Sequence, residues 1–168
     1  MRGGPRRSRR GPAQRWENKP AMAATLHEML LAPEVQPQVV VDCEALVNAE
    51  VSDLSGISGT AIKLAYKTVR TFDAGHIHYM IQTLLPRMAD ELQPYWVDFN
   101  AGGGGQFGDY LAKREDDVCE ALLAITDERG QNSSRPTIVK AYNTVRGGAA
   151  KHVKAALPSV GALAQRYA

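Results

Sequence analysis

The chain has 168 residues, of which 44% are hydrophobic and 23% are charged, and its formal net charge is +2. This composition is typical of one globular domain. The 2 cysteines are too few for a disulfide framework, and no apolar run approaches the roughly 18 residues that a membrane span needs. Length and composition therefore exclude a disulfide scaffold and predict a soluble protein.

The first 20 residues differ sharply in charge from the rest of the chain. They hold seven basic residues and one acid, Glu17, which gives a net charge of +6. The remaining 148 residues therefore hold 13 basic and 17 acidic residues, a net charge of −4. Because this segment is rich in Gly and Pro and poor in apolar surface, we predict a disordered basic tail over residues 1–21. Two interpretations stay open: an arm that binds nucleic-acid phosphates, or a non-native extension upstream of a start at Met22.

From Thr25 onward, apolar residues recur at the spacing of an amphipathic helix, and no stretch alternates as a strand does. The fold class predicted is all-α. The pattern predicts three helices in each half of the chain, with the third bent or restarted at Pro86 and at Pro158. Their approximate ranges are 34–54, 59–72 and 75–99, then 109–129, 135–147 and 149–167.

An internal repeat relates the two halves. A shift of 76 residues lays residues 43–77 on residues 119–153 without a gap, with 13 identities in 35 positions. Cys43 falls on Cys119 and Tyr66 on Tyr142; beyond a four-residue deletion the match resumes at a shift of 72. A repeat of this kind indicates repeated architecture. We predict a bundle of about six helices built from two tandem pseudo-symmetric repeats.

The repeats divide residues 22–168, which we predict to form a single helical domain. Repeat one covers about 31–99 and repeat two covers 107–168, joined by a Gly-rich linker over residues 100–106. The glycine run lacks the Gly-Lys-Ser/Thr of a phosphate-binding loop, which favours a linker. Because neither half is large, we expect both to pack around one shared core.

The sequence offers no catalytic motif. It contains no CxxC, HExxH, GxSxG or GxGxxG pattern. Cys43 and Cys119 lie on apolar helix faces, which predicts buried and unreactive thiols. We therefore predict a non-enzymatic protein with no catalytic residue, no cofactor and no metal.

One side-chain arrangement occurs in both repeats and is the candidate ligand site. Tyr66 and Arg70 are four residues apart, so they share one helix face, and His76 opens the next helix. The second repeat holds the same arrangement, in Tyr142, Arg146 and His152. A phenol, a guanidinium and an imidazole together could bind an anion such as a carboxylate or phosphate. The alternative is structural, in which the arginines bind carbonyls at helix ends and the tyrosine rings pack.

Three segments carry a family resemblance: Met22–Leu30, Gln106–Arg114 and Val145–Val153. Through them residues 22–168 resemble a family of small, uncharacterised, all-helical actinobacterial proteins of the mycobacterial type. The resemblance implies a cytoplasmic actinobacterial setting. It implies no activity, cofactor or catalytic residue.

The sequence favours a protein-interaction or scaffold module whose helical surface binds a partner protein or a second copy. One alternative is a binder of a small apolar or anionic ligand between the repeats, and another is nucleic-acid association through the basic tail. An enclosed cavity would favour the ligand, whereas an exposed apolar patch would favour the protein partner.

Overall fold

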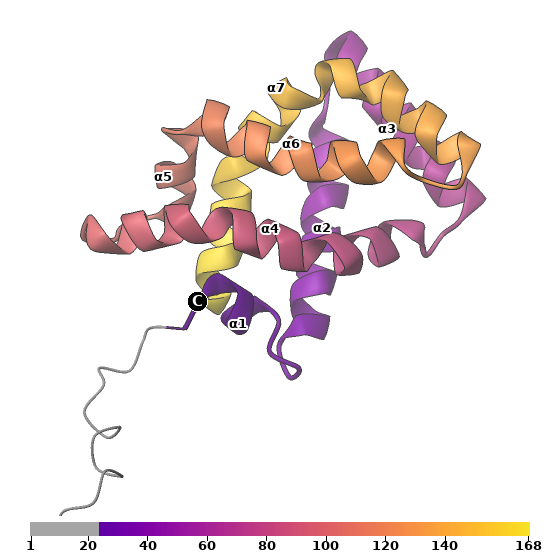
Figure 1. Ribbon diagram of the computed structural model, residues 1–168. Helices are drawn as coiled ribbons and strands as arrows, with labels where there is room; N and C mark the ends of the chain where they lie inside the picture. The colour runs from indigo at the N-terminus through magenta and orange to yellow at the C-terminus, as the bar shows by residue number, and fades with distance from the viewer. Residues whose placement is uncertain (1–23) are drawn as a thin grey trace, which may run out of the picture.

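The computed structural model describes residues 24–168 (Figure 1), so the predicted tail over residues 1–21 lies outside the described residues. Within them the chain forms seven helices and no strand, and the predicted all-α class is confirmed. The helices are α1 (Leu26–Leu30), α2 (Gln36–Asp53), α3 (Gly56–Phe72), α4 (His76–Ala101), α5 (Phe107–Ala112), α6 (Glu115–Gln131) and α7 (Pro136–Tyr167).

The helices form two crossing sets. Figure 1 shows α4 and α6 running across the front of the bundle, with α2 and the C-terminal part of α7 crossing behind them. The first half of α7 packs along α3, and its C-terminal part packs on α5 and reaches α1. Helix α7 therefore touches both halves of the chain.

Helix α1 is a short element that the apolar spacing did not predict. A capping box starts it: the Thr25 side chain accepts a hydrogen bond from the Glu28 backbone N–H at 3.1 Å, and the Glu28 carboxylate accepts one from the Thr25 N–H at 2.8 Å. Leu26 and Leu30 bury the inner side of this turn. Reciprocal capping and burial together hold a helix too short to form alone.

The single helix predicted over 109–129 is wrong, because the chain breaks at Lys113 and Arg114 into α5 and α6. Three acids, Glu115, Asp116 and Asp117, occupy the first turn of α6. Their negative charge favours a helix N-terminus there, and the two preceding basic residues suit the C-terminus of α5. The charge order along these five residues explains the break.

The two helices predicted over 135–147 and 149–167 are one continuous helix, α7. In the first half of the chain a turn at residues 73–75 separates α3 from α4, and the Asp73 carboxylate accepts a hydrogen bond from the Gly75 N–H at 3.2 Å. The residues 76 positions later are Ala149, Ala150 and Lys151, which favour a helix. Helix α7 thus replaces a helix–turn–helix, although Figure 1 shows that it changes direction along its length.

Neither proline restarts its helix, since Pro86 lies inside α4 and Pro158 lies inside α7. An interior proline bends a helix, and packing on neighbouring helices can hold it in place. Helix α4 also extends to Ala101, so the glycine-rich connection is shorter than the predicted linker over 100–106.

One hydrophobic core draws on both halves of the chain. Its buried residues include Leu85, Leu92 and Phe99 from α4, together with Phe107 from α5 and Leu157 from α7. The rings of Phe99 and Phe107 lie 5.2 Å apart, between centroids, across the glycine-rich connection. This shared core positions α7, and α3 packs along α7.

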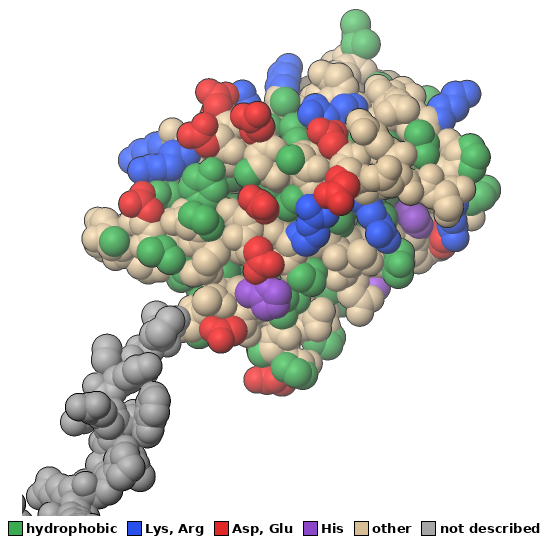
Figure 2. All heavy atoms as spheres, viewed as in Figure 1, with side chains coloured by type: hydrophobic (Ala, Val, Ile, Leu, Met, Phe, Trp, Pro, Cys, Tyr) green, Lys and Arg blue, Asp and Glu red, His purple; other side chains and the backbone are tan. Residues whose placement is uncertain are grey.

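Acidic side chains gather over α4 and α6 on the face drawn in Figure 2. Helices α3 and α7 contain no acidic residue, so charge is divided between helices as well as along the sequence. No helix in the described part of the chain is long and apolar enough to cross a membrane.

Candidate functional site

The first predicted set, Tyr66 and Arg70, converges on one side chain of the preceding helix. Arg70 Nη1 donates to the side-chain oxygen of Asn48 at 2.8 Å, and the Tyr66 hydroxyl donates to the same oxygen. Burial raises the pKa of Tyr66 above its ordinary value. The pair therefore joins α3 to α2 through a neutral acceptor.

The second predicted set, Tyr142 and Arg146, converges on a carboxylate instead. Arg146 binds Asp127 through two nitrogens, with Nη2 at 2.9 Å from Oδ2, and the Tyr142 hydroxyl donates to Oδ1 at 2.5 Å. The Arg146 hydrogen bond, followed by that of Tyr142, holds the pKa of Asp127 below its ordinary value. This two-point ion pair joins α7 to α6 and neutralises the guanidinium.

The two predicted histidines lie in different surroundings. His152 Nε2 lies 3.0 Å from the Ser58 hydroxyl, which links α7 to the start of α3. His76 Nδ1 lies 3.9 Å from the Asp73 carboxylate, and its buried Nε2 has no hydrogen-bond partner among the described residues. Neither histidine hydrogen-bonds to a tyrosine or arginine of the predicted sets within residues 24–168.

The six predicted residues therefore form separate contacts. No hydrogen bond among the described residues joins one set to the other, and the two arginines have different acceptors on different helices. This geometry suits fastening of neighbouring helices. Anion binding by these sets stays an untested prediction.

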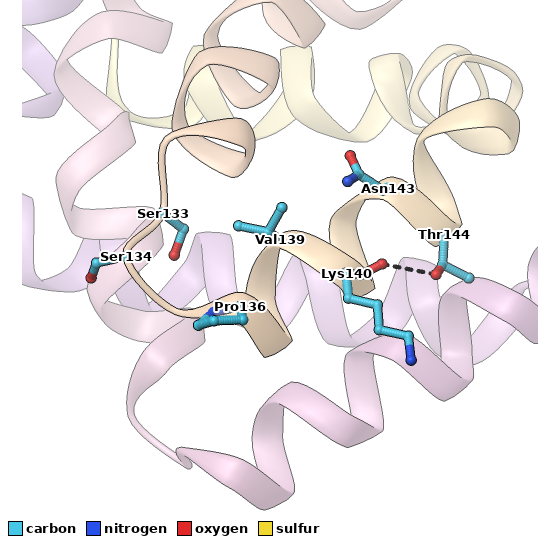
Figure 3. Close-up of a pocket in the computed structure, with 7 residues that line it drawn as sticks. All are labelled: Ser133, Ser134, Pro136, Val139, Lys140, Asn143 and Thr144. Carbon is cyan, nitrogen blue, oxygen red and sulfur yellow. Dashed lines mark hydrogen bonds between the residues drawn. The ribbon is translucent and has the colours of Figure 1, made fainter.

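A shallow depression of about 590 Å³ lies at the start of α7 (Figure 3). Figure 3 shows Val139 and Asn143 directed to one side of the helix and Lys140 directed away from them. Lys140 is the only charged side chain in the lining, which holds none of the six predicted residues. The lining also holds the hydroxyls of Ser133, Ser134 and Thr144, with no carboxylate or histidine beside them to act as a general base.

A second depression, of about 710 Å³, lies beside the glycine-rich connection. Two of its charged groups bind each other: Arg114 lies 3.5 Å from Asp98 and 3.9 Å from the Tyr110 ring centre, and the Tyr110 hydroxyl donates to Asp98. Gly103, Gly104 and Gly105 all have positive φ, a conformation that favours glycine. The glycine run is therefore needed to turn the chain from α4 into α5.

The structure shows a further surface that the sequence reasoning missed, on the outer face of α3. Ile57 is 94% exposed and Leu64 is 65% exposed, seven residues apart and so on one side of the helix. Three exposed threonines continue this side. We call the five residues the α3 stripe: Ile57, Thr60, Leu64, Thr68 and Thr71.

The threonines of the α3 stripe present methyl groups to the solvent. The hydroxyls of Thr60, Thr68 and Thr71 each donate to the backbone carbonyl four residues earlier, at 2.8 Å. Their polar atoms are therefore engaged within the helix. The stripe therefore offers a partner aliphatic and methyl groups and no free hydroxyl donor from these three threonines.

Basic side chains flank the α3 stripe. Lys63 and Lys67 are exposed and four residues apart, which places them together along one edge. Within residues 24–168, the ion pairs of the protein involve neither lysine. Both ammonium groups therefore face the solvent beside an apolar surface.

A signal for the α3 stripe was present in the sequence. The helical pattern that includes Ile62, Val69 and Phe72 leaves Ile57 and Leu64 on another side of the helix. Within that helical pattern, Val69 is buried. Phe72 is 61% exposed, and the Arg135 guanidinium lies 6.0 Å from its ring centre. A second apolar side on one helix could have indicated an exposed contact surface.

The fold and these surfaces define an all-α helical-bundle protein whose described residues show no cluster of metal-ligand side chains. Residues 26–168 match a family of unknown function, DUF6918, and the chain belongs to that family. Neither a curated protein nor a solved structure matches the chain. The actinobacterial and cytoplasmic setting stays a prediction from the sequence.

Proposed function

We propose that this protein is a non-enzymatic interaction module that docks a partner protein through the α3 stripe. The observation that carries the proposal is the exposure of Ile57 and Leu64 on one helix face whose threonine hydroxyls are all engaged. Exposed apolar side chains that gather on one face, rather than lying scattered, are typical of protein contact sites. The rest of the bundle acts as a rigid support, since α3 packs on α7.

The two apolar anchors of the α3 stripe are too few to hold a partner tightly by themselves. Full burial of an aliphatic side chain contributes about 1.5–3 kcal/mol, so the two anchors supply about 3–6 kcal/mol. Association costs an estimated 4–15 kcal/mol in lost translational and rotational freedom. Ile57 and Leu64 alone would therefore hold a partner weakly, and flanking groups must add to the affinity.

Photocrosslinking in cells of the source organism tests the proposal. A benzophenone amino acid replaces Leu64 in one variant and Glu91, an exposed residue of α4, in a matched control. We expect a discrete crosslinked protein from position 64 and none from position 91. Equal labelling from both positions, or none from position 64, would contradict the proposal.

The two alternatives have less support. Asp127 already binds Arg146 at two points, which weighs against an anionic ligand on that guanidinium. Nucleic-acid association rests on the basic tail over residues 1–21, which lies outside the described residues.

A further inference from the structure

We infer that the partner of the α3 stripe is an acidic amphipathic helix, with aliphatic side chains on one face and Glu or Asp along its edge. This inference rests on the proposed function of the stripe. It adds the chemistry of the partner, which the exposure of the stripe alone does not specify.

Charge complementarity is the first argument. Helix α3 carries Lys63, Lys67 and Arg70 and no acidic residue. Arg70 donates to Asn48, whereas the two lysines are exposed and form no ion pair with a described residue. A carboxylate beside them would gain a hydrogen-bonded partner at the rim of the contact, where charges guide association and orientation.

The shape of the α3 stripe is the second argument. Its members are spaced by three, four, four and three residues, the spacing at which helix faces pack together. The small side chain of Thr60 between the anchors Ile57 and Leu64, and those of Thr68 and Thr71 beyond them, allow a partner backbone to approach closely. A strand has no docking edge here, because the backbone groups of a helix interior bond within the helix.

Other occupants fit less well. A second copy packed antiparallel would set Lys63 and Lys67 against the same lysines, and like charges oppose association. Nucleic-acid phosphates could bind Lys63 and Lys67, but they would leave the apolar side chains of Ile57 and Leu64 exposed. The threonine hydroxyls between and beyond these side chains already donate within the helix. An acidic helix satisfies both the apolar centre and the basic edge.

Three helical peptides test the inference on the full chain. They share leucines at helical spacing and differ only in the flanking residues, which are Glu, Gln or Lys. Binding is measured by fluorescence anisotropy. We expect the Glu peptide to bind at least about tenfold more tightly than the Lys peptide, and the variant K63E/K67E to reverse this order.

The control variant K140E/K151E makes the same change in net charge on exposed residues of α7. It should keep the preference for the Glu peptide, which separates the α3 edge from general attraction by the basic tail. Circular dichroism of each variant verifies that the helices form. An unchanged preference in K63E/K67E would overturn the inference, because the attraction would then arise elsewhere.

Two further outcomes would also overturn it. Equal binding of the three peptides, lost in Leu64→Ser, would show a helix-binding stripe without charge preference and leave the proposed function standing. Binding of single-stranded DNA, but of no peptide, that K63E/K67E abolishes would assign the lysine edge to nucleic acid. Photocrosslinking from position 64 decides the proposed function independently of these peptides.

Discussion

Gly108 and Gly161 lie in contact where the backbone of α5 crosses the backbone of α7. A methyl group on Gly161 would lie 2.4 Å from the Cα of Gly108, and one on Gly108 would lie 2.3 Å from the carbonyl oxygen of Pro158. Real side chains do not approach other atoms so closely. Only glycine on both helices allows this crossing, which sets α5 against the shared core.

Substitution of either glycine should therefore destabilise the protein strongly. We expect Gly161→Ala to lower the free energy of unfolding by about 1–3 kcal/mol or more, because the backbones must separate to admit the methyl group. Urea denaturation followed by circular dichroism measures the change.

Gly147 provides the control within the same helix. A methyl group there meets no atom within 4 Å, and its φ is not positive. Gly147→Ala should raise the free energy of unfolding by about 0.5–1 kcal/mol, since alanine favours the helix. Equal effects of the two substitutions would show that close approach does not limit the crossing.

The two arginines of the predicted sets should differ in their contribution to stability. Arg146 makes a two-point, partly exposed ion pair with Asp127, whereas Arg70 donates once to the neutral Asn48. We expect Arg146→Ala to cost about 1 kcal/mol and Arg70→Ala about 0.5 kcal/mol. Anion binding by these arginines is the alternative, and it is tested by measuring the thermal melting temperature with and without phosphate. A stabilisation by phosphate that is lost in both variants would indicate an anion site.

Stability should fall in acid because of Asp73 and Asp127. Hydrogen bonds from Arg135 and Arg146 hold the pKa values of these carboxyls below their ordinary value of 3.8. A lowered folded-state pKa adds stability above the unfolded pKa, and that stability is lost as the pH falls through the folded-state pKa. We expect the unfolding free energy to decline below about pH 4.

Asp127→Asn tests the origin of that decline. The amide cannot be protonated in this range, so the variant should start less stable near pH 7 and lose less stability between pH 5 and pH 2. Denaturant titrations at a series of pH values and fixed ionic strength measure how the free energy of unfolding of the variant and of the parent changes with pH. Parallel curves for the variant and the parent would exclude Asp127 as a contributor.

Two glutamines, 72 residues apart, make matching contacts. Gln93 Oε1 accepts from the Leu26 N–H that opens α1 at 2.7 Å, and Gln165 Oε1 accepts from the Phe107 N–H that opens α5 at 2.9 Å. We expect Gln93→Ala and Gln165→Ala each to cost about 1 kcal/mol, since each leaves a helix N–H unpaired. Gln165→Ala should lower the free energy of unfolding somewhat more than Gln93→Ala, because Gln165 Nε2 also donates to the Gly105 carbonyl at 2.9 Å.

Exposed Gln82 of α4 serves as the comparison and should change stability little when replaced by alanine. The internal duplication stays a prediction, and a clear loss of stability on substitution of both Gln93 and Gln165 would support it. A cost at one glutamine alone would mean that the two short helices are held differently.

The sequence by itself determined most of the helical segments, although the apolar spacing missed α1 and the break between α5 and α6. The ranges predicted as 34–54, 59–72 and 75–99 correspond to α2, α3 and α4, because apolar spacing, prolines and glycines act through neighbouring residues. The order of charges over Arg114–Asp117 is a local signal for the break before α6. The alanines at 149–150 are a local signal for the continuity of α7. Where helices form in this chain, and approximately how far they extend, thus depends largely on residues that are neighbours in sequence.

Only the tertiary structure decided which helix faces are covered. Arg70 finds Asn48 and Arg146 finds Asp127 because residues far apart in sequence pack together, and a motif of two residues cannot specify its acceptor. The exposure of Ile57 and Leu64 likewise depends on where α7 and the other helices lie. Helical spacing places these side chains on a face, but burial depends on contacts between distant segments, which spacing alone does not encode.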